Sequence, residues 1–305
     1  MNQELRGHTL ALLTILLWGT TFVSTKILLH NDLSPMEILL TRFVMGTCFL
    51  MLLFPKRLKG TTLKQEAYFA AAGLCGITLY YLFENNALIY TLASNAALIA
   101  STSPFFTVLL ARFFLKDETI RPQFYFGMVL SFIGVGLMSF SGATELQINL
   151  KGDFLALLAA IIWSFYSIFS KKISSFGYNT IQTTRRTFMY GILFMLPMIP
   201  FTDVAWSTEK FFNTTVILNL MFLGLGASAI CFVTWNLALK SLGAIKASLY
   251  INAVPMVTVI LSIIVLHERL TWMSGTGIAL VLCGLSVSQF KKRSKVIIHS
   301  DSHQK

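Results

Sequence analysis

Long apolar stretches separated by short polar loops run through the whole chain. A helix needs about 20 apolar residues to cross the hydrocarbon core of a bilayer. Ten stretches approach that length, and they are continuous, whereas the strands of a membrane barrel alternate apolar and polar residues. These stretches are 8–29, 35–54, 67–90, 92–114, 122–141, 152–173, 181–201, 215–239, 243–266 and 272–290. The pattern predicts an all-α integral membrane protein with ten transmembrane helices.

The second half of the chain loosely repeats the first. The stretch 86–118, NALIYTLASNAALIASTSPFFTVLLARFFLKDE, has a copy at 236–268, NLALKSLGAIKASLYINAVPMVTVILSIIVLHE. The first residues of the two copies are 150 positions apart, as are the last, and each copy has a proline near its middle. Each half has five spans, and an odd number of spans reverses the second half in the membrane. The sequence therefore predicts two inverted five-helix repeats.

The repeat also defines the expected domains. Trp18 lies eight residues before a lysine in the first span, and Trp163 lies eight residues before a lysine in the sixth. We expect the first repeat at 8–141, the second at 152–290 and a basic cytoplasmic tail at 291–305.

Composition and charge restrict the possible environments and partners. Hydrophobic residues make up 55% of the chain and charged residues 12%, whereas soluble domains carry about 25% charged residues. The formal net charge is +11, and lysine and arginine gather in alternate loops, such as 56–64, and in the tail. Because such loops face the cytoplasm, both termini are expected there. The basic residues then meet anionic lipid headgroups, and we expect a lipid bilayer rather than nucleic acid as the partner.

Four motifs in order resemble a known family. They are WGTTFVSTK in the first span, TRF in the second, NAALIASTSPFFTVLLARFFLKDE in the fourth, and GAIKASLYINAVPMVTVILSIIVLHERLT in the ninth. Together they resemble the EamA domain of the drug/metabolite transporter superfamily, in two copies from about Leu10 to Phe290. The resemblance implies a ten-helix carrier of a bacterial plasma membrane. Such carriers mostly export amino acids, other metabolites or drugs.

Pro104 and Pro255 are the first candidates for the working centre. A proline inside a helix removes one hydrogen bond and pushes against an earlier carbonyl, and in lipid that carbonyl needs another partner. Ser101 lies beside the first proline and Asn252 beside the second. The prolines either shape packing or line a cavity at the middle of the membrane, and we expect Ser101 and Asn252 to line such a cavity.

Glu84 is the one carboxylate well inside an expected span. An ionisable group at that depth is a candidate functional residue. Arg42 lies at a comparable depth in the second span, and it matches an arginine usual in the resembled family. Two interpretations stay open. The two residues form a structural ion pair, or Glu84 carries a proton in the transport path or binds a substrate amine.

Aromatic and polar side chains on inward faces provide further candidates. Trp18 and Trp163 occupy equivalent positions in the two halves, and Trp235 precedes an asparagine of the repeated stretch. We expect the following residues to face a cavity: Trp18, Thr21, Tyr81, Trp163, Tyr166 and Trp235.

Four charged residues near the ends of spans receive structural interpretations. Lys26 and Lys171 are expected to extend to the lipid headgroups. Glu118 and Glu268 are expected to lie in turns at the membrane interface.

These features favour secondary transport of a small molecule, with amino acids as the expected substrate, outward as the expected direction, and protons or no ion as the coupling partner. Neither a cofactor nor a metal is expected, because there is no nucleotide-binding motif and the four cysteines lack metal-ligand spacing. The alternatives are an intramembrane enzyme and a non-transporting receptor or assembly subunit. An intramembrane enzyme lacks support, since its catalytic motifs are missing and no pair of aspartates lies deep in a span: Asp32, Asp117 and Asp203 fall in expected loops and Asp153 at the very start of a span. The sequence does not indicate an oligomeric state.

Overall fold

The computed structural model describes residues 3–115, 122–141, 150–202, 204, 208–268 and 271–289. These residues form helices, and no strand occurs among them, so the all-helical prediction is confirmed for this part of the chain. The first half contains α1 (Gln3–His30), α2 (Pro35–Leu53), α3 (Leu63–Gly73), α4 (Tyr80–Tyr90), α5 (Ala93–Ala100), α6 (Ser103–Leu115) and α7 (Pro122–Ser141). The second half contains α8 (Leu150–Ser174), α9 (Thr180–Met195), α10 (Thr208–Phe211), α11 (Thr214–Met221), α12 (Cys231–Leu242), α13 (Ala244–Ser248), α14 (Val254–Val265) and α15 (Trp272–Gln289).

Seven helical segments of the described residues are long and apolar enough to cross a membrane. They are Gln3–His30, Pro35–Leu53, Leu63–Tyr90, Ala93–Phe114, Leu150–Ser174, Thr214–Leu242 and Ala244–Val265. The expected spans 122–141 and 272–290 contain shorter apolar helical stretches, Tyr125–Gly134 and Gly275–Gly284. The expected span 181–201 begins as α9 and ends in the 3-10 turn Leu196–Phe201.

The start of α2 shows how local sequence fixes a helix end. Ser34 precedes the helix, and its Oγ accepts a hydrogen bond from the Glu37 backbone N–H at 3.3 Å. The Glu37 carboxylate accepts one from the Ser34 N–H at 2.7 Å. Pro35 takes the first helical position, where its missing N–H costs nothing. This capping box satisfies the first donors of α2 and sets where the chain turns after α1.

Two helices change pitch at equivalent places. A π-helical segment, Leu74–Leu79, joins α3 to α4, and another, Phe222–Ile230, joins α11 to α12. Gly76 and Gly226 lie 150 positions apart within them. A π segment is rare and is frequently found at functional sites. Both wide turns come directly before the stretches that carry Glu84 and Trp235.

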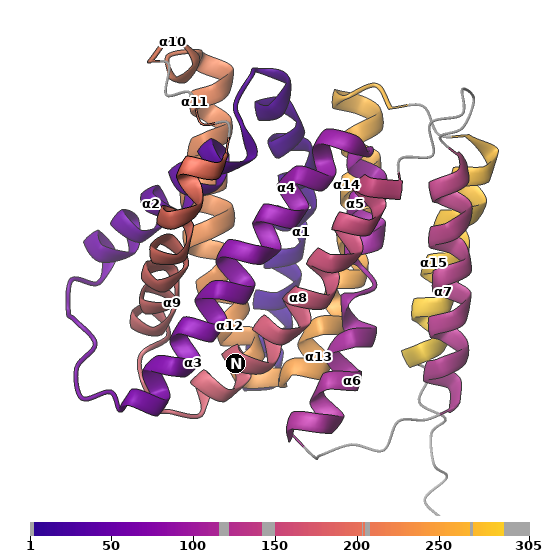
Figure 1. Ribbon diagram of the computed structural model, residues 1–305. Coiled ribbons are helices and arrows are strands. Elements are labelled where there is room, and N and C mark those ends of the chain that lie inside the picture. Colours follow the sequence, from indigo (N-terminus) through magenta and orange to yellow (C-terminus); the bar gives the residue numbers. More distant parts are fainter. Residues whose placement is uncertain are drawn as a thin grey trace, which may run out of the picture.

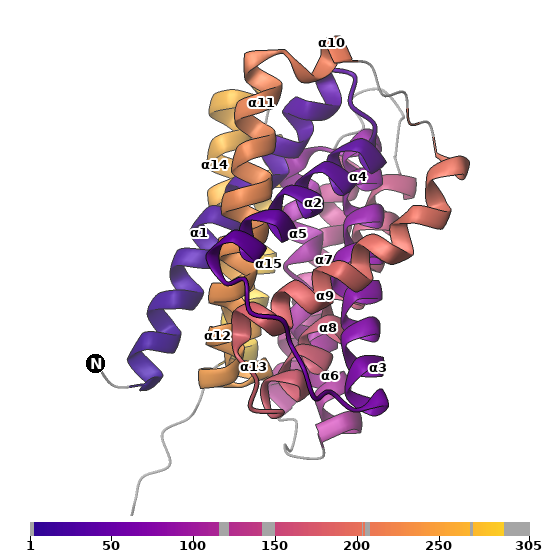
Figure 2. The same cartoon turned by 90° about the vertical axis from the view of Figure 1, so that its left-hand side faces the viewer.

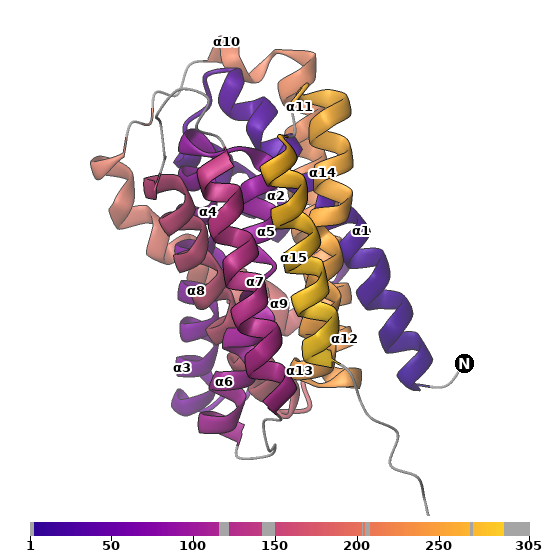
Figure 3. The same cartoon turned by 90° about the vertical axis from the view of Figure 1, so that its right-hand side faces the viewer.

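The arrangement in space separates a main bundle from one outlying pair of helices. Helix α1 packs on α12 and α14, and α4 packs on α8. Helices α2, α3 and α9 cover one side of this bundle (Figure 2). Helices α7 and α15 lie side by side on the opposite side (Figures 1 and 3). The N-terminal end of α1 and the C-terminal end of α15 lie at one end of the molecule, and α10 lies at the other (Figure 1).

Small residues bring α7 and α15 into close contact. A methyl group at Gly134 would come within 2.6 Å of the Gly277 carbonyl oxygen, and one at Gly284 within 2.4 Å of the Gly127 carbonyl oxygen. Ser131 Oγ donates a hydrogen bond to the Val281 carbonyl at 3.2 Å. Early positions of each helix meet late positions of the other, so the two helices run antiparallel. Ser131 and Val281 are 150 positions apart, and the Gly134–Gly277 contact has its equivalent in Gly284–Gly127, because 150 positions separate Gly127 from Gly277 and Gly134 from Gly284.

Candidate functional site

Both proline-containing spans are interrupted rather than merely bent. Helix α5 ends at Ala100 and α6 begins at Ser103, while the 3-10 turn Leu249–Ala253 separates α13 from α14. Pro104 is the second residue of α6 and Pro255 the second residue of α14. A proline in the first turn of a helix leaves no carbonyl without its partner, because that N–H would be unpaired anyway. The prolines therefore start half-helices.

A small cavity lies where the two interruptions meet. About 30 Å³ of it is open to the centre of a water-sized sphere. One water needs about 10–15 Å³ by this measure, so the cavity has room for about two waters. Its lining residues are Trp18, Thr21, Phe22, Tyr80, Tyr81, Glu84, Ala100, Ser103, Trp163, Ile251 and Val254. In this conformation the cavity is closed to anything of metabolite size.

The two interruptions contribute equivalent residues to this cavity. Ala100 and Ile251 are 151 positions apart, as are Ser103 and Val254, and the same offset separates the two prolines. Sequence reasoning missed Ala100 and Ile251, because small and aliphatic side chains in a span look like packing. The offset between the prolines is the signal that could have found them.

Aromatic rings from both halves surround the cavity. Trp18 and Trp163, which the repeat makes equivalent, meet edge to face with ring centroids 5.2 Å apart. The ring of Tyr80 lies 4.7 Å from that of Trp163. The Trp18 Nε1–H donates to the Ala227 carbonyl at 3.0 Å, which fixes that ring. Trp163 Nε1 has no hydrogen-bond partner among the described residues.

The carboxylate of Glu84 reaches the cavity from α4. The residue is buried, and the Tyr80 hydroxyl donates to its Oε1 at 3.3 Å. Arg42 of α2 is fully buried nearby, and its guanidinium lies 4.3 Å from the centre of the Tyr81 ring. Its Nε donates to Ser228 Oγ at 2.9 Å. No ion pair within 4.0 Å joins Arg42 and Glu84, so the expected direct pair is not formed in the described structure.

Five of the residues expected at a cavity lie at this one, namely Trp18, Thr21, Tyr81, Glu84 and Trp163. The others lie around it without lining it. Trp235 is fully buried against Trp18, with ring centroids 5.2 Å apart. Tyr166 packs behind Trp163, and its hydroxyl donates to Asn236 Oδ1 at 3.1 Å.

The remaining expected residues belong to the helix interruptions. Ser101 bonds the Leu98 carbonyl at 2.6 Å, so its hydroxyl is satisfied by its own backbone and does not line the cavity. Pro104 and Pro255 are each one residue beyond a lining position. Asn252 follows the lining residue Ile251, and its side-chain amide has no hydrogen-bond partner among the described residues.

Charged residues close the bundle at both ends. Glu268 accepts hydrogen bonds at the start of α5, from the Ala93 N–H at 2.8 Å and the Ser94 hydroxyl at 2.7 Å. At the opposite end His8 Nδ1 and the Tyr250 hydroxyl are 2.6 Å apart, and the Lys246 ammonium donates to Glu4 at 3.0 Å. Glu268 thus joins the two halves across their interface, beyond the turn role expected from the sequence. Glu118 lies outside the described residues.

Two equivalent lysines bind helix ends instead of extending to lipid headgroups. The Lys26 ammonium donates to the carbonyls of Leu88 and Thr91 at the end of α4. The Lys171 ammonium donates to the Leu239 carbonyl near the end of α12 at 3.4 Å. A cation at a helix C-terminus satisfies free carbonyls and complements the helix dipole. Both expected headgroup contacts are therefore replaced by helix caps.

Comparison with known proteins places the molecule in a family. The model of the EamA-like transporter family matches residues 5–140 and again 150–289. The chain belongs to the EamA-like transporter family. An uncharacterized transporter of Archaeoglobus fulgidus is 28% identical over 297 residues, which cover 96% of this chain and 99% of that protein. A probable amino-acid metabolite efflux pump of Escherichia coli strain K12 is 26% identical over 299 residues, covering 94% and 96%.

The fold of this EamA-like transporter is also known from solved structures. One crystal structure superposes with a TM-score of 0.67 at 21% sequence identity, and the alignment covers 92% of this chain and 97% of the other. At this identity the likeness shows the fold alone. Among the described residues no group of three or more His, Cys, Asp or Glu side chains could hold a metal ion.

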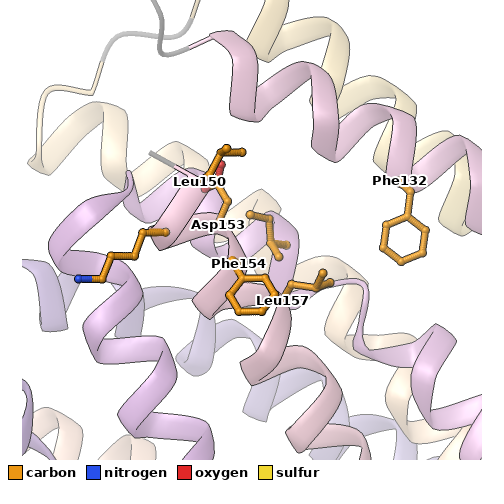
Figure 4. Close-up of a pocket in the computed structure, with 7 residues that line it drawn as sticks. Phe132, Leu150, Asp153, Phe154 and Leu157 are labelled. Atoms are coloured by element: carbon orange, nitrogen blue, oxygen red, sulfur yellow. The ribbon is translucent and has the colours of Figure 1, made fainter. Parts of the chain in front are cut away.

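A larger hollow of the EamA-like transporter lies at its side, between α7 and α8. About 520 Å³ of it is open to a water-sized sphere, and it is lined by Ile99, Phe132, Leu150, Lys151, Asp153, Phe154 and Leu157. Figure 4 shows Phe132 on α7 and Phe154 and Leu157 on α8 around this open space. Asp153 accepts from the Thr91 hydroxyl and Lys151 donates to the Tyr90 hydroxyl, so its polar groups are already partnered. The apolar walls suit lipid chains and supply no recognition chemistry.

Proposed function

We propose that this EamA-like transporter is a secondary transporter that exports amino acids or similar small metabolites across the plasma membrane of a bacterium by alternating access. The observation that carries the proposal is the closed cavity at the two helix interruptions, with one carboxylate among aromatic rings. Broken helices that meet at the middle of a membrane form the substrate sites of many carriers. The relatives named amino-acid metabolite efflux pumps support amino acids as the substrate class.

The proposal includes ten membrane spans as two inverted repeats, at 8–141 and 152–290, and a cytoplasmic tail at 291–305. The antiparallel crossing of α7 and α15, in which equivalent residues of the two helices make the same contacts, supports the inversion. The helix interruptions, the π segments and the lysine caps each occur once in each half, which supports the repeat at other places in the chain. The tail lies outside the described residues.

Contacts that hold the two halves together at each end of the bundle support alternating access. Glu268 on the start of α5 lies at one end, and His8 with Tyr250 lies at the other. These contacts consist of a few hydrogen bonds and ion pairs, which a rocking motion of the halves can exchange. Substrate would enter when one set opens while the other holds. Glu84 can carry one proton, so protons are included as a coupling ion.

Reconstitution in liposomes tests this function. The purified protein is sealed into liposomes, and the flux of labelled amino acids and related metabolites is measured with and without a pH gradient. We expect flux of at least one amino acid above that of empty liposomes. An absence of flux for the whole panel would contradict transport and favour a receptor or assembly subunit. Full flux that is still pH-dependent in Glu84→Gln would exclude Glu84 as the proton carrier.

A further inference from the structure

We infer that the central cavity recognises its substrate through an amine, and that a carboxylate on the substrate is not required. The inference rests on the proposed transport function and specifies its substrate class. The transporter would accept organic amines with an apolar body, whether or not they are amino acids.

Charge is the first argument. Glu84 is the one charged side chain among the residues that line the cavity. The nearest cation, Arg42, is outside the lining, its guanidinium lies over the Tyr81 ring, and its Nε is bonded to Ser228. Glu84 forms no ion pair in the described structure, and a buried carboxylate without one costs free energy until an opposite charge joins it. A substrate ammonium supplies that charge.

The rings around Glu84 favour the same ligand. The rings of Trp18, Tyr80 and Trp163 all line the cavity, with neighbouring centroids 4.7 to 5.2 Å apart. Aromatic faces carry partial negative charge and attract ammonium groups. Ser103 Oγ also lines the cavity, is buried, and has no hydrogen-bond partner among the described residues. A hydroxyl oxygen there can accept a hydrogen bond from an ammonium.

A carboxylate finds little to bind in the same cavity. A helix N-terminus binds anions through the free N–H groups of its first turn. Here Pro104 and Pro255 have no N–H, and the Phe105 N–H already donates to the Thr102 carbonyl at 3.0 Å. Trp163 Nε1 is an available donor, but a neutral donor contributes less than a paired charge.

The size of the cavity indicates which part of the substrate is held first. A space of about 30 Å³ accepts a head group and excludes the body of a metabolite. The body must therefore enter as the Trp18 and Trp163 rings separate. Because these rings come from equivalent positions of the two halves, their separation is the motion that alternating access requires.

Three compounds of one shape test the inference. They are 2-phenylethylamine, which has the amine alone, phenylalanine, which has both groups, and 3-phenylpropionate, which has the carboxylate alone. Binding to the purified full-length protein is measured by calorimetry, and flux is measured in liposomes. We expect both amines to bind with Kd values within about threefold of each other, and 3-phenylpropionate to bind at least about tenfold more weakly, which corresponds to about 1.4 kcal/mol.

Matched variants test whether Glu84 binds the amine. Glu84→Gln keeps the size and removes the charge, and it should weaken binding of 2-phenylethylamine at least about tenfold. Glu66→Gln is the control, because Glu66 lies on the same continuous helix but bonds Arg186 and Tyr190 away from the cavity. Tyr80→Phe, which removes only the hydroxyl that bonds Glu84, keeps the test valid if Glu84→Gln does not fold. It should change the Kd of the amines and leave that of 3-phenylpropionate unaltered.

The outcomes separate this inference from the proposed function. Equal binding of 3-phenylpropionate, no binding of either amine, or a Kd for phenylalanine more than about tenfold below that of 2-phenylethylamine would overturn it. The last result would assign the carboxylate to Arg42 after a movement of Tyr81. If other metabolites cross the membrane while neither amine binds, the inference fails and transport stands. If the amines bind through Glu84 without flux, the inference stands and transport fails.

Discussion

Gly76 has no side chain where the ring of Tyr166 passes. A methyl group there would come within 2.1 Å of a ring carbon, and the ring is fully buried, so it cannot move aside freely. Tyr166 in turn packs on Trp163 at the cavity, with centroids 4.8 Å apart. The space at Gly76 thus sets the position of Tyr166, and Tyr166 sets that of the Trp163 ring at the cavity.

Gly76→Ala should destabilise the protein by about 1–3 kcal/mol, because overpacking forces side chains and backbone to shift. Gly226→Ala is the matched control, since the equivalent methyl group meets only the Phe222 ring, at 3.6 Å. Thermal unfolding in detergent measures both. Equal midpoints for the two variants would show that Tyr166 is not held against Gly76.

The chemistry-bearing residues of the site could be predicted from sequence, and its apolar wall could not. Glu84 and Trp18 stand out because charges and tryptophans are rare in a span. Ala100 and Ile251 do not, because small and aliphatic residues are ordinary packing in a span. The position of Arg42 behind the Tyr81 ring, rather than on Glu84, depends on χ angles and on Ser228 from the other half. No local pattern encodes that choice.

At the scale of elements, the helix interruptions depend on more than proline. The Ser101 and Thr102 hydroxyls bond carbonyls three residues earlier, and the Thr102 N–H bonds the Ile99 carbonyl. These bonds close the end of α5 so that α6 can start afresh. The sequence predicted where the helix is disturbed, because proline is locally decisive. The sequence could not predict how the freed groups are paired, and this pairing decides between a bend and a complete interruption.

The start of α5 should loosen when the carboxylate of Glu268 is removed. Glu268→Ala takes away charge-assisted hydrogen bonds from the Ala93 N–H and from the N–H and hydroxyl of Ser94, each contributing about 1.5–3 kcal/mol. We expect these two amides to exchange hydrogen at least about tenfold faster. Hydrogen exchange followed by mass spectrometry measures this. Glu4→Gln, at the opposite end, is the control and should leave exchange in α5 unchanged. Exchange that stays slow in Glu268→Ala would contradict the role of Glu268 in holding the start of α5.

At the scale of the molecule, a basic loop lies at the same end as the N-terminal end of α1 and the C-terminal end of α15. The connection after α2, which is rich in lysine, lies at the same end as the N-terminal end of α1, and α10 lies at the other end (Figure 1). Sequence reasoning reached this arrangement because loop charge and span number are global properties that need no packing detail. The sequence could not predict that α7 pairs with α15 apart from the main bundle. Glycines indicate close helix packing, but they do not indicate which helix is the neighbour.

Single cysteines test the orientation in intact cells. In a variant with the four native cysteines replaced, Lys59→Cys should be protected from a membrane-impermeant thiol reagent, and Phe212→Cys should be labelled. Both side chains are exposed, so access depends on the side of the membrane. Labelling after permeabilisation shows that both cysteines are reactive. The reverse pattern would place the termini outside.

The central claim is that the cavity at the helix interruptions is the transport site, opened alternately to each side. Ser103→Cys places a thiol in its wall, and Ser131→Cys, buried between α7 and α15, is the control. During turnover in liposomes, a small water-soluble thiol reagent added on either side should modify position 103, stop flux, and be blocked by the transported substrate. Position 131 should stay unmodified. Modification of position 103 with undiminished flux, or access from one side alone, would contradict the account.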